Sequence, residues 1–172
     1  MLKIISYVWL YLGWFACVLL AKNNLAAYSL FIPLIGWLLF FKAFLPAWQV
    51  CFKLFFLSAL GMLADTVALK LNIIHFSADP VTNFLPIWMI SLWLLFVPSI
   101  YLLKKLFSRR LWLAAVVGAI AGPISYKSGK SFGVLSLQGA EGILIYAIFW
   151  SLYLPLAINW VNTPDDPPSA RR

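Results

Sequence analysis

Six long apolar runs separated by short polar gaps constrain this chain more than any other feature of its sequence. An apolar helix of about 20 residues crosses the hydrocarbon core of a bilayer, which is about 30 Å thick. Hydrophobic residues make up 64% of the chain and charged residues only 10%, too few to cover a soluble protein. These values exclude a soluble enzyme domain, a secreted disulfide scaffold and a disordered chain, and they predict a multi-pass membrane protein.

The apolar runs predict an all-α fold, with six transmembrane helices packed in one compact bundle. Continuous runs favour helices over barrel strands, which would alternate over segments of about ten residues. The tail, residues 162–172, holds three prolines and paired charges, which are typical of a disordered segment. Within a transmembrane domain over residues 1–161, the predicted spans are 4–21, 25–41, 50–69, 87–103, 111–126 and 142–161.

The positions of Lys and Arg predict how the chain is oriented. If the N-terminus is cytoplasmic, nine basic residues fall on the cytoplasmic side and four on the outer side, as the positive-inside rule requires. Residues 104–110 alone supply four of the nine. An even number of spans then gives N-in and C-in termini. The net charge of +8 therefore reflects topology, and we expect no nucleic-acid partner because no basic stripe lies on a polar face.

Asp65 is an acidic residue inside the third predicted span. A charge within a span costs roughly 2.5–3.5 kcal/mol on insertion scales, so such residues are rare and face the bundle interior. Lys53, about 18 Å away along the same helix, lies near the cytoplasmic end and can extend to the interface. The shorter Asp65 side chain cannot. We therefore expect Asp65 to face protein or a water-filled pocket in the outer half of the bilayer.

Several polar residues are expected at the depth of Asp65. The fifth span breaks at Gly122-Pro123, where the proline is expected to loosen the last helical turn. Polar groups that converge in an apolar bundle indicate a pocket, here one that faces the periplasm. The catalytic candidates are Asp65, Tyr126 and Lys127, and the ligand-binding candidates are Asp65, Ser125, Tyr126, Trp88 and Glu141. Two alternatives remain open: a structural ion pair between Asp65 and Lys127, and a Glu141 side chain that faces water.

Small residues predict which helices pack closely. A ridge of small residues spaced four apart lets a second helix approach. We expect the ridge of the fifth span to pack against the weakly polar face of the third. The ridge comprises Ala114, Gly118 and Gly122, and the face comprises Ser58, Gly61, Asp65 and Ala68.

Metal and cofactor motifs are weak throughout the sequence. His75 and Asp79 are four residues apart, but they lie in a segment with no reason to be helical. Residues 128–131 resemble the end of a phosphate-binding loop, but Ile124 occupies the position of the required glycine. A single histidine also makes a Ser-His-Asp triad improbable. We therefore expect no metal and no cofactor.

The sequence resembles a family of small proteobacterial inner-membrane proteins classed as a domain of unknown function. The resemblance implies a six-span fold in the bacterial inner membrane, and it implies no activity. Its most specific part is the segment from Gly122 to Tyr126. The matching residues are Gly13-Trp14-Phe15-Ala16-Cys17, Gly61 with Asp65, Pro86 with Trp88 and Trp93, and Gly122-Pro123-Ile124-Ser125-Tyr126.

The leading hypothesis is a periplasm-facing intramembrane pocket that recognises or modifies a lipid or other amphiphile. In an enzyme of this kind, Asp65 would be the general acid or base, and Tyr126 or Lys127 would polarise the substrate. One alternative is a small proton-coupled transporter in which Asp65 titrates. The other is a non-catalytic scaffold that docks a partner membrane protein. The expected partners are thus the lipid bilayer, a lipid or amphiphilic ligand, and a membrane-protein partner.

Overall fold

The computed structural model describes residues 2–77 and 84–162, and it confirms the predicted bundle of six long helices. All six are long and apolar enough to cross a membrane, the second together with the 3-10 helix η1 (Ala26–Leu30) that precedes it. The chain is thus a multi-pass membrane protein. The helices are α1 (Leu2–Lys22), α2 (Phe31–Phe44), α3 (Trp48–Lys70), α4 (Ile87–Phe107), α5 (Leu111–Ser131) and α6 (Gly139–Asn162).

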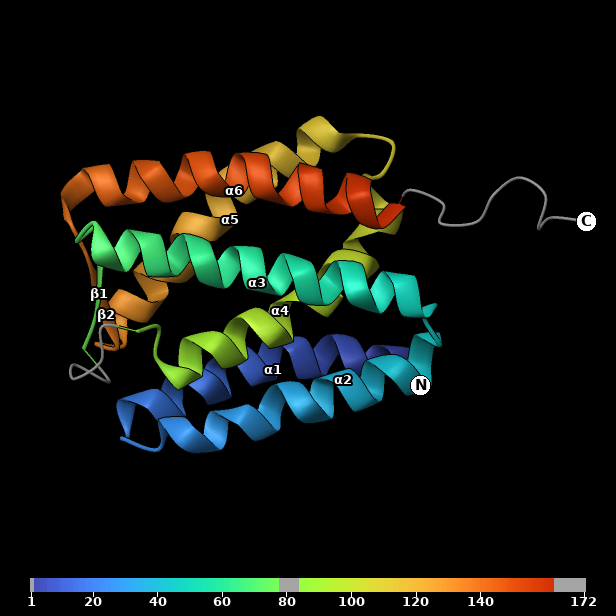
Figure 1. Cartoon of the computed structure of the whole chain (residues 1–172), viewed down its shortest axis with the longest axis horizontal. Helices are drawn as coiled ribbons and strands as arrows, with labels where there is room; N and C mark the ends of the chain where they lie inside the picture. The colour runs from blue at the N-terminus through green and yellow to red at the C-terminus, as the bar shows by residue number, and fades with distance from the viewer. Residues whose placement is uncertain (1, 78–83, 163–172) are drawn as a thin grey trace, which may run out of the picture.

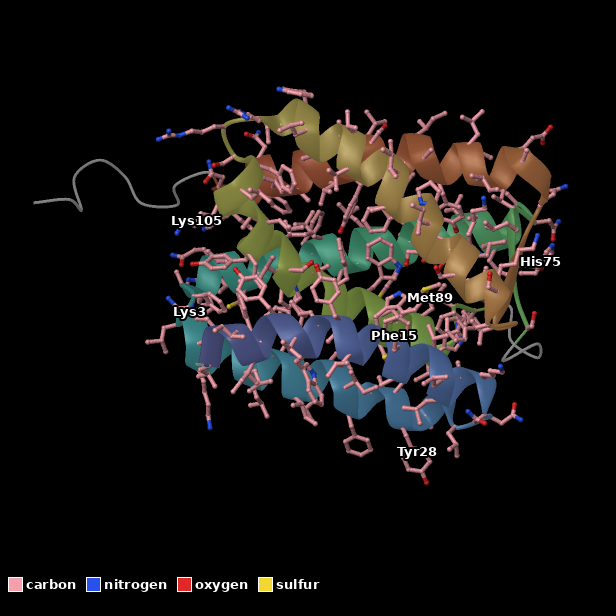
Figure 2. All side chains as sticks on the ribbon, turned by 180° about the vertical axis from the view of Figure 1, so that it is seen from behind. Lys3, Phe15, Tyr28, His75, Met89 and Lys105 are labelled. Atoms are coloured by element: carbon pink, nitrogen blue, oxygen red, sulfur yellow. The ribbon has the colours of Figure 1, made fainter. Side chains whose placement is uncertain are left out.

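Helix α4 lies at the centre of the bundle and packs against α1, α2, α3 and α6 (Figure 1). Helix α5 packs mainly along α6 and barely contacts α4. Large side chains such as Tyr11 and Tyr28 are 76% and 58% exposed, and Tyr28 projects outward from the bundle (Figure 2). Such a surface suits contact with lipid acyl chains.

Residues with special backbone preferences end two of the helices. Asn24 follows α1 and Asn72 follows α3, with φ angles of 60° and 57°. Asn tolerates this left-handed region because its short side chain can hydrogen-bond locally. Pro86 precedes α4 in an extended conformation, which suits a proline at a helix start. The observed helices extend the predicted spans by a few residues at most ends.

A short two-stranded sheet joins two connections at one end of the bundle, and the sequence analysis did not predict it. Strand β1 (Ile74–Phe76) pairs antiparallel with β2 (Leu135–Leu137), with Ile74 opposite Leu137. The backbone N–H of Ser77 also donates to the Val134 carbonyl at 3.0 Å. We call this end of the molecule the sheet end. The start of α1 and the end of α6 both lie at the opposite end (Figure 1), as an even number of spans requires.

Three labelled side chains mark the two ends. Lys3 and Lys105 lie at the end opposite the sheet, and His75 lies at the sheet end (Figure 2). Under the predicted orientation, the sheet end faces outward. Two earlier expectations fall outside the described residues: the disorder of the tail beyond residue 162, and the pairing of His75 with Asp79.

The expected break at Pro123 is wrong, because α5 continues without interruption to Ser131. A proline inside a helix removes one backbone hydrogen bond, and membrane helices tolerate this loss where neighbouring helices support the freed group. Helices α4 and α6 likewise contain Pro98 and Pro155. As a result, Ser125 and Tyr126 lie within a continuous helix instead of on a loosened end.

The expected pairing of small-residue faces is also wrong. The small residues of α5 pack against α6, because a Cβ atom added to Gly118 would lie 2.3 Å from the Trp150 carbonyl oxygen. Gly61 of α3 accommodates Trp93 of α4, whose ring would lie 2.2 Å from an added Cβ atom. The small residues of α5 and of α3 therefore each pack against a helix that places a tryptophan at the contact. Small residues reveal a close approach but do not identify which helix makes it.

Candidate functional site

Asp65 lies in the interior of the bundle, about three-quarters of the way along α3 towards the sheet end. Its side chain is 0% exposed. Gly61, one helical turn earlier, leaves space for the ring of Trp93 to approach α3. The same turn of α3 therefore provides both the carboxylate and the space for one of its donors.

Three side chains from three other helices donate hydrogen bonds to the Asp65 carboxylate. Trp93 Nε1 of α4 donates to Oδ2 at 2.7 Å. The hydroxyl groups of Tyr126 in α5 and Tyr146 in α6 both donate to Oδ1, at 2.7 Å and 2.8 Å. A carboxylate accepts several hydrogen bonds and donates none, so three donors match it well. Asp65 therefore connects α3, α4, α5 and α6 at one level.

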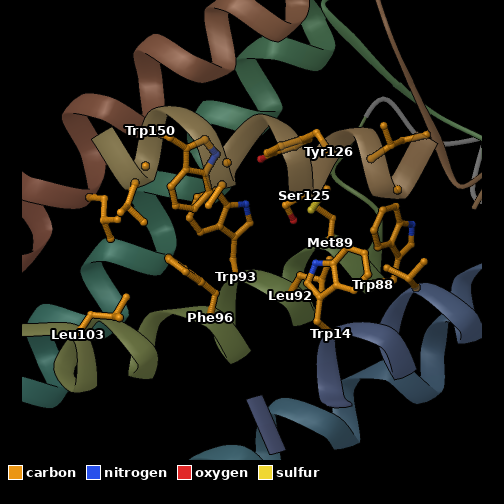
Figure 3. A pocket seen from close by; sticks show the side chains of 18 residues that line it. Trp14, Trp88, Met89, Leu92, Trp93, Phe96, Leu103, Ser125, Tyr126 and Trp150 are labelled. Atoms are coloured by element: carbon orange, nitrogen blue, oxygen red, sulfur yellow. The ribbon is translucent and has the colours of Figure 1, made fainter. Parts of the chain in front are cut away.

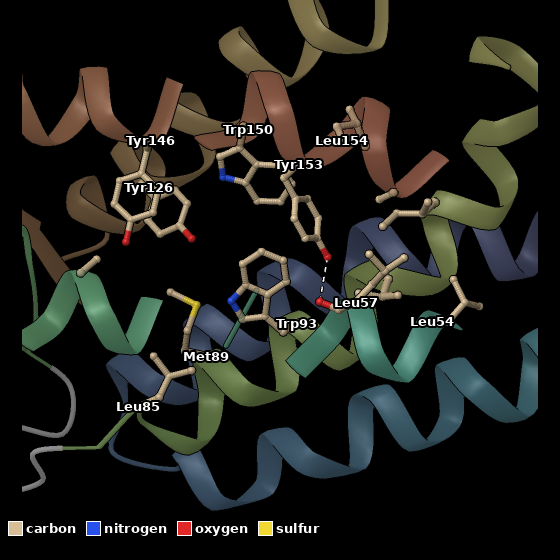
Figure 4. Packing of buried hydrophobic residues seen from close by; sticks show 14 of the residues in the cluster. Leu54, Leu57, Leu85, Met89, Trp93, Tyr126, Tyr146, Trp150, Tyr153 and Leu154 are labelled. Carbon is tan, nitrogen blue, oxygen red and sulfur yellow. Dashed lines mark hydrogen bonds between the residues drawn. The ribbon is translucent and has the colours of Figure 1, made fainter. Parts of the chain in front are cut away.

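Stacked aromatic rings surround the carboxylate. Tyr126 and Tyr146 stack with ring centroids 3.8 Å apart (Figure 4), which brings their hydroxyl groups to the same oxygen. Trp93 stacks on Trp150 at 5.4 Å with the rings nearly parallel. Tyr153 adds a further link between α6 and α3, because its hydroxyl donates to the Leu57 carbonyl at 2.9 Å. Packing on several sides thus fixes the orientation of the donors.

A cavity of about 200 Å³ lies beside this cluster, between α1, α4 and α5 (Figure 3). It exceeds the roughly 150 Å³ of an engineered apolar protein cavity that binds benzene, so it is large enough for part of a ligand. Small residues of α5 line one side of the cavity and leave its volume unfilled. Its aromatic walls are Trp14, Trp88, Trp93, Phe96, Tyr126 and Trp150.

The cavity is almost entirely apolar. Its described lining residues include no Asp, Glu, Lys, Arg or His. The polar groups of the lining are the Ser125 and Tyr126 hydroxyls and the tryptophan N–H groups, and Asp65 already accepts from Tyr126 and Trp93. Asp65 itself lies behind these two residues and does not line the cavity. The arrangement can therefore bind an apolar chain, while the carboxylate orients two of the walls.

The structure brings some of the candidate residues together and separates others. Asp65 and Tyr126 are hydrogen-bonded, and Ser125, Tyr126 and Trp88 line the cavity. Lys127 and Glu141 are exposed and take no part in either arrangement. Because α5 remains helical, Lys127 projects about 100° away from Tyr126 around the helix axis. The partners of Asp65 are thus neutral donors, and the alternative ion pair with Lys127 is not formed.

Sequence reasoning missed Trp93 and Tyr146 as partners of Asp65. The residue types themselves indicate both partners, because buried Tyr hydroxyl and Trp N–H groups usually find a hydrogen-bond partner. Asp65 is the acidic side chain inside the apolar spans, so it is the natural acceptor for polar aromatic residues at its depth. Among residues 2–77 and 84–162, no group of three or more His, Cys, Asp or Glu side chains could hold a metal ion.

One of the comparisons with known proteins gives a match. A family model described as "Protein of unknown function (DUF2878)" matches residues 3–156. No curated protein and no solved structure gives a significant match to the chain. The match covers all six helices except the first residue of α1 and the last six residues of α6, so it includes both the Asp65 cluster and the cavity.

Proposed function

Because the chain belongs to this family, whose description carries no activity, we propose a function from geometry: the cavity between α1, α4 and α5 binds the apolar chain of a lipid or other amphiphile. The observation that carries this proposal is an apolar cavity of about 200 Å³ with aromatic walls, open on one side of the membrane bundle. Ligand-binding sites are concave and lined mostly by hydrophobic and aromatic side chains, as this cavity is.

The shape of the cavity supports a chain-like ligand. Its lining extends along α4 from Trp88 to Leu103 (Figure 3), a distance of about 22 Å at 1.5 Å per residue. Val117 and Ala121 of α5 both line the cavity and are exposed on the outside of the bundle. An acyl chain can therefore reach the cavity sideways from the bilayer, without crossing water.

In this proposal Asp65 is a positioning residue. Its two oxygens accept from three donors, and two of those donors, Trp93 and Tyr126, form cavity walls. A general acid or base must reach the substrate within hydrogen-bond distance, and Asp65 does not line the cavity. The geometry thus favours binding over acid–base chemistry.

The distribution of Lys and Arg supports an orientation in which both termini are cytoplasmic and the sheet end is periplasmic. The membrane would then be the bacterial inner membrane. In this orientation the Asp65 cluster lies in the outer half of the bilayer, and the cavity extends from that half towards the inner one.

Photo-crosslinking tests the proposal directly. The purified protein is reconstituted in vesicles that contain a phospholipid with a diazirine in the middle of one acyl chain. We expect crosslinks to residues of α1, α4 and α5 that line the cavity. Ala121→Trp fills the cavity from its open side, and it should lower the crosslinked fraction about tenfold. Ile120→Trp is the matched control, because Ile120 is 57% exposed and does not line the cavity.

Two results would overturn binding in the cavity. One is a crosslinked fraction that is equal in the Ala121→Trp and Ile120→Trp proteins. The other is a set of crosslinks spread evenly over the outward-facing residues of all six helices, which would indicate ordinary contact with bulk lipid.

A further inference from the structure

Trp14 of α1 and Ser125 of α5 provide the accessible polar side-chain atoms in the walls of the cavity. Within the described part of the chain, neither Trp14 Nε1 nor Ser125 Oγ forms a hydrogen bond. The buried side-chain N and O atoms that have no partner there are Trp88 Nε1 and Trp150 Nε1. The Trp14 nitrogen and the Ser125 oxygen are not buried in this way, so both keep accessible surface.

Ser125 differs from the other serines within the helices in how its hydroxyl is used. A serine inside a helix commonly donates to a backbone carbonyl three or four residues earlier. Ser128, on the same helix, does so to the Ile124 carbonyl at 2.9 Å. Ser125 does not, and its oxygen points into the space between α5 and α4 (Figure 3). The helical serines with such a bond are Ser6, Ser29, Ser58, Ser91, Ser99, Ser128, Ser131 and Ser151.

Trp14 differs in the same way from tryptophans whose N–H group has an acceptor. Trp9 Nε1 donates to a backbone carbonyl at 3.0 Å, and Trp93 Nε1 donates to Asp65 at 2.7 Å. The ring of Trp14 packs edge-on against Phe132, with centroids 6.4 Å apart. Its nitrogen points from α1 towards α5 (Figure 3). The N–H group of Trp14 is therefore directed into the cavity.

The two groups lie at a similar depth on opposite walls of the cavity. At 1.5 Å per residue, Ser125 is about 9 Å and Trp14 about 12 Å from the end of its helix at the sheet. The hydroxyl of Tyr126 and the N–H of Trp93, which also belong to lining residues, already donate to Asp65. A few polar groups that converge in an apolar pocket normally fix the orientation of its ligand.

The chemistry of the two groups limits what they can bind. An indole N–H only donates, whereas a hydroxyl donates or accepts, so a ligand group that bonds both must be an acceptor. The described lining holds no cationic side chain for an anion, and the Asp65 carboxylate behind Tyr126 and Trp93 disfavours one. An ammonium group has no lone pair to accept with. An uncharged oxygen, which has two lone pairs, matches both donors.

We infer that Trp14 and Ser125 bind an uncharged oxygen of the amphiphile, which accepts a hydrogen bond from each, while the apolar chain extends along α4 towards Leu103. This inference rests on the proposed function and adds two contact residues and a ligand class to it. A plain hydrocarbon fits the cavity but leaves both donors without an acceptor. Charged amphiphiles bring a charge that the lining does not neutralise.

Competition against the diazirine lipid separates these classes. The competitors, at equal mole fraction in the bilayer, are hexadecane, hexadecanol, hexadecanone and hexadecyltrimethylammonium. Hexadecanol or hexadecanone should compete about tenfold better than hexadecane, which is the effect of hydrogen bonds worth about 1.4 kcal/mol. The better of the two identifies a hydroxyl or a carbonyl as the source of the oxygen. Equal competition by hexadecane and both oxygen-bearing compounds would overturn the inference and leave chain binding intact, as would stronger competition by the ammonium compound.

Two variants test the contact residues. Ser125→Ala removes the hydroxyl and Trp14→Phe removes the N–H, and each should reduce the tenfold advantage to about threefold while hexadecane competes as before. Ser128→Ala is the control for the first variant, because Ser128 lies on the same helix outside the cavity lining. Trp112→Phe is the control for the second, because Trp112 is 65% exposed and lies outside the cavity.

An advantage that stays at its full value in either Ser125→Ala or Trp14→Phe would overturn the assignment of that pair. If Trp14→Phe fails to fold, the benzothiophene analogue of tryptophan at position 14 keeps the ring and lacks the N–H. Failure of the proposed function gives a different result, in which crosslinking is insensitive to Ala121→Trp and none of the four competitors reduces it. A loss of the oxygen preference alone leaves the Ala121→Trp effect in place.

Discussion

At the scale of single residues, Asp65 shows how a membrane protein accommodates a buried carboxylate through neutral hydrogen-bond donors. Burial of an isolated carboxylate is very costly, and proteins normally pair it or surround it with donors. Here Trp93, Tyr126 and Tyr146 supply the donors. Hydrogen bonds to a charged group contribute about 1.5–3 kcal/mol each, more than neutral ones. The cluster therefore joins four helices through a single side chain.

Asp65→Asn should destabilise the fold by about 1–3 kcal/mol. The amide keeps one oxygen for Tyr126 and Tyr146, but its NH₂ group then faces the N–H of Trp93, donor against donor. The free energy of unfolding in detergent micelles measures the effect. Glu141→Gln is the control, because Glu141 is exposed and its change should stay within about 0.5 kcal/mol. Equal stability of the two variants would contradict this role for Asp65.

The sequence was sufficient to predict that Asp65 is sheltered, since a short acidic side chain inside an apolar span has few alternatives. Its partners were harder to predict. Tyr146 and Trp93 lie 81 and 28 residues from Asp65 along the chain. No spacing rule connects residues on different helices, so the set of donors emerges only when helix rotation and packing are known.

At the scale of secondary-structure elements, the six helices follow from continuous apolar runs of membrane-spanning length, and the structure confirms six long apolar helices. The two strands were missed because each has three residues, too short for an alternating pattern to stand out. The predicted break at Pro123 is wrong, because the free-energy cost of one lost backbone hydrogen bond depends on whether neighbouring helices support the freed carbonyl. The small residues of α5 pack against Trp150 of α6, and Gly61 of α3 packs against Trp93 of α4. The positions of small residues on a helix do not indicate which tryptophan packs against them.

Gly118→Ala tests the contact between α5 and α6. The added Cβ atom would lie 2.3 Å from the Trp150 carbonyl oxygen, a backbone atom that cannot rotate away. The helices must separate, and we expect a loss of about 1–3 kcal/mol in the free energy of unfolding. Val116→Ala on the exposed face of the same helix should change stability far less. A Gly118→Ala protein as stable as the Val116→Ala protein would show that the two helices are not in close contact.

At the scale of the whole molecule, the two ends of the bundle differ. Both termini and the labelled Lys3 and Lys105 lie at one end, and the small sheet closes the other (Figures 1 and 2). Counting Lys and Arg along the sequence, the positive-inside rule predicts that the end with both termini is cytoplasmic. Thus the sequence predicts an orientation that the fold alone does not determine.

Cysteine accessibility measures this orientation. In a background without Cys17 and Cys51, Ala47→Cys marks the connection between α2 and α3, and His75→Cys marks the sheet. Both positions are exposed. In intact spheroplasts, a membrane-impermeant maleimide should label the protein with His75→Cys, whereas the one with Ala47→Cys should require permeabilisation. The reverse pattern would invert the topology and place Asp65 in the inner leaflet.

The sheet also restrains some of the helices around the cavity and leaves others unrestrained. Strand β1 follows α3 and precedes α4, while β2 follows α5 and precedes α6, so backbone hydrogen bonds fasten four helices at that end. Neither α1 nor α2 adjoins a strand, and α1 is retained by its packing against α2 and α4. Helix α1, which bears Trp14, is therefore the wall of the cavity that no strand restrains. A ligand that enters past Val117 and Ala121 of α5 thus meets, on the far side, a helix that can shift without breaking a strand hydrogen bond.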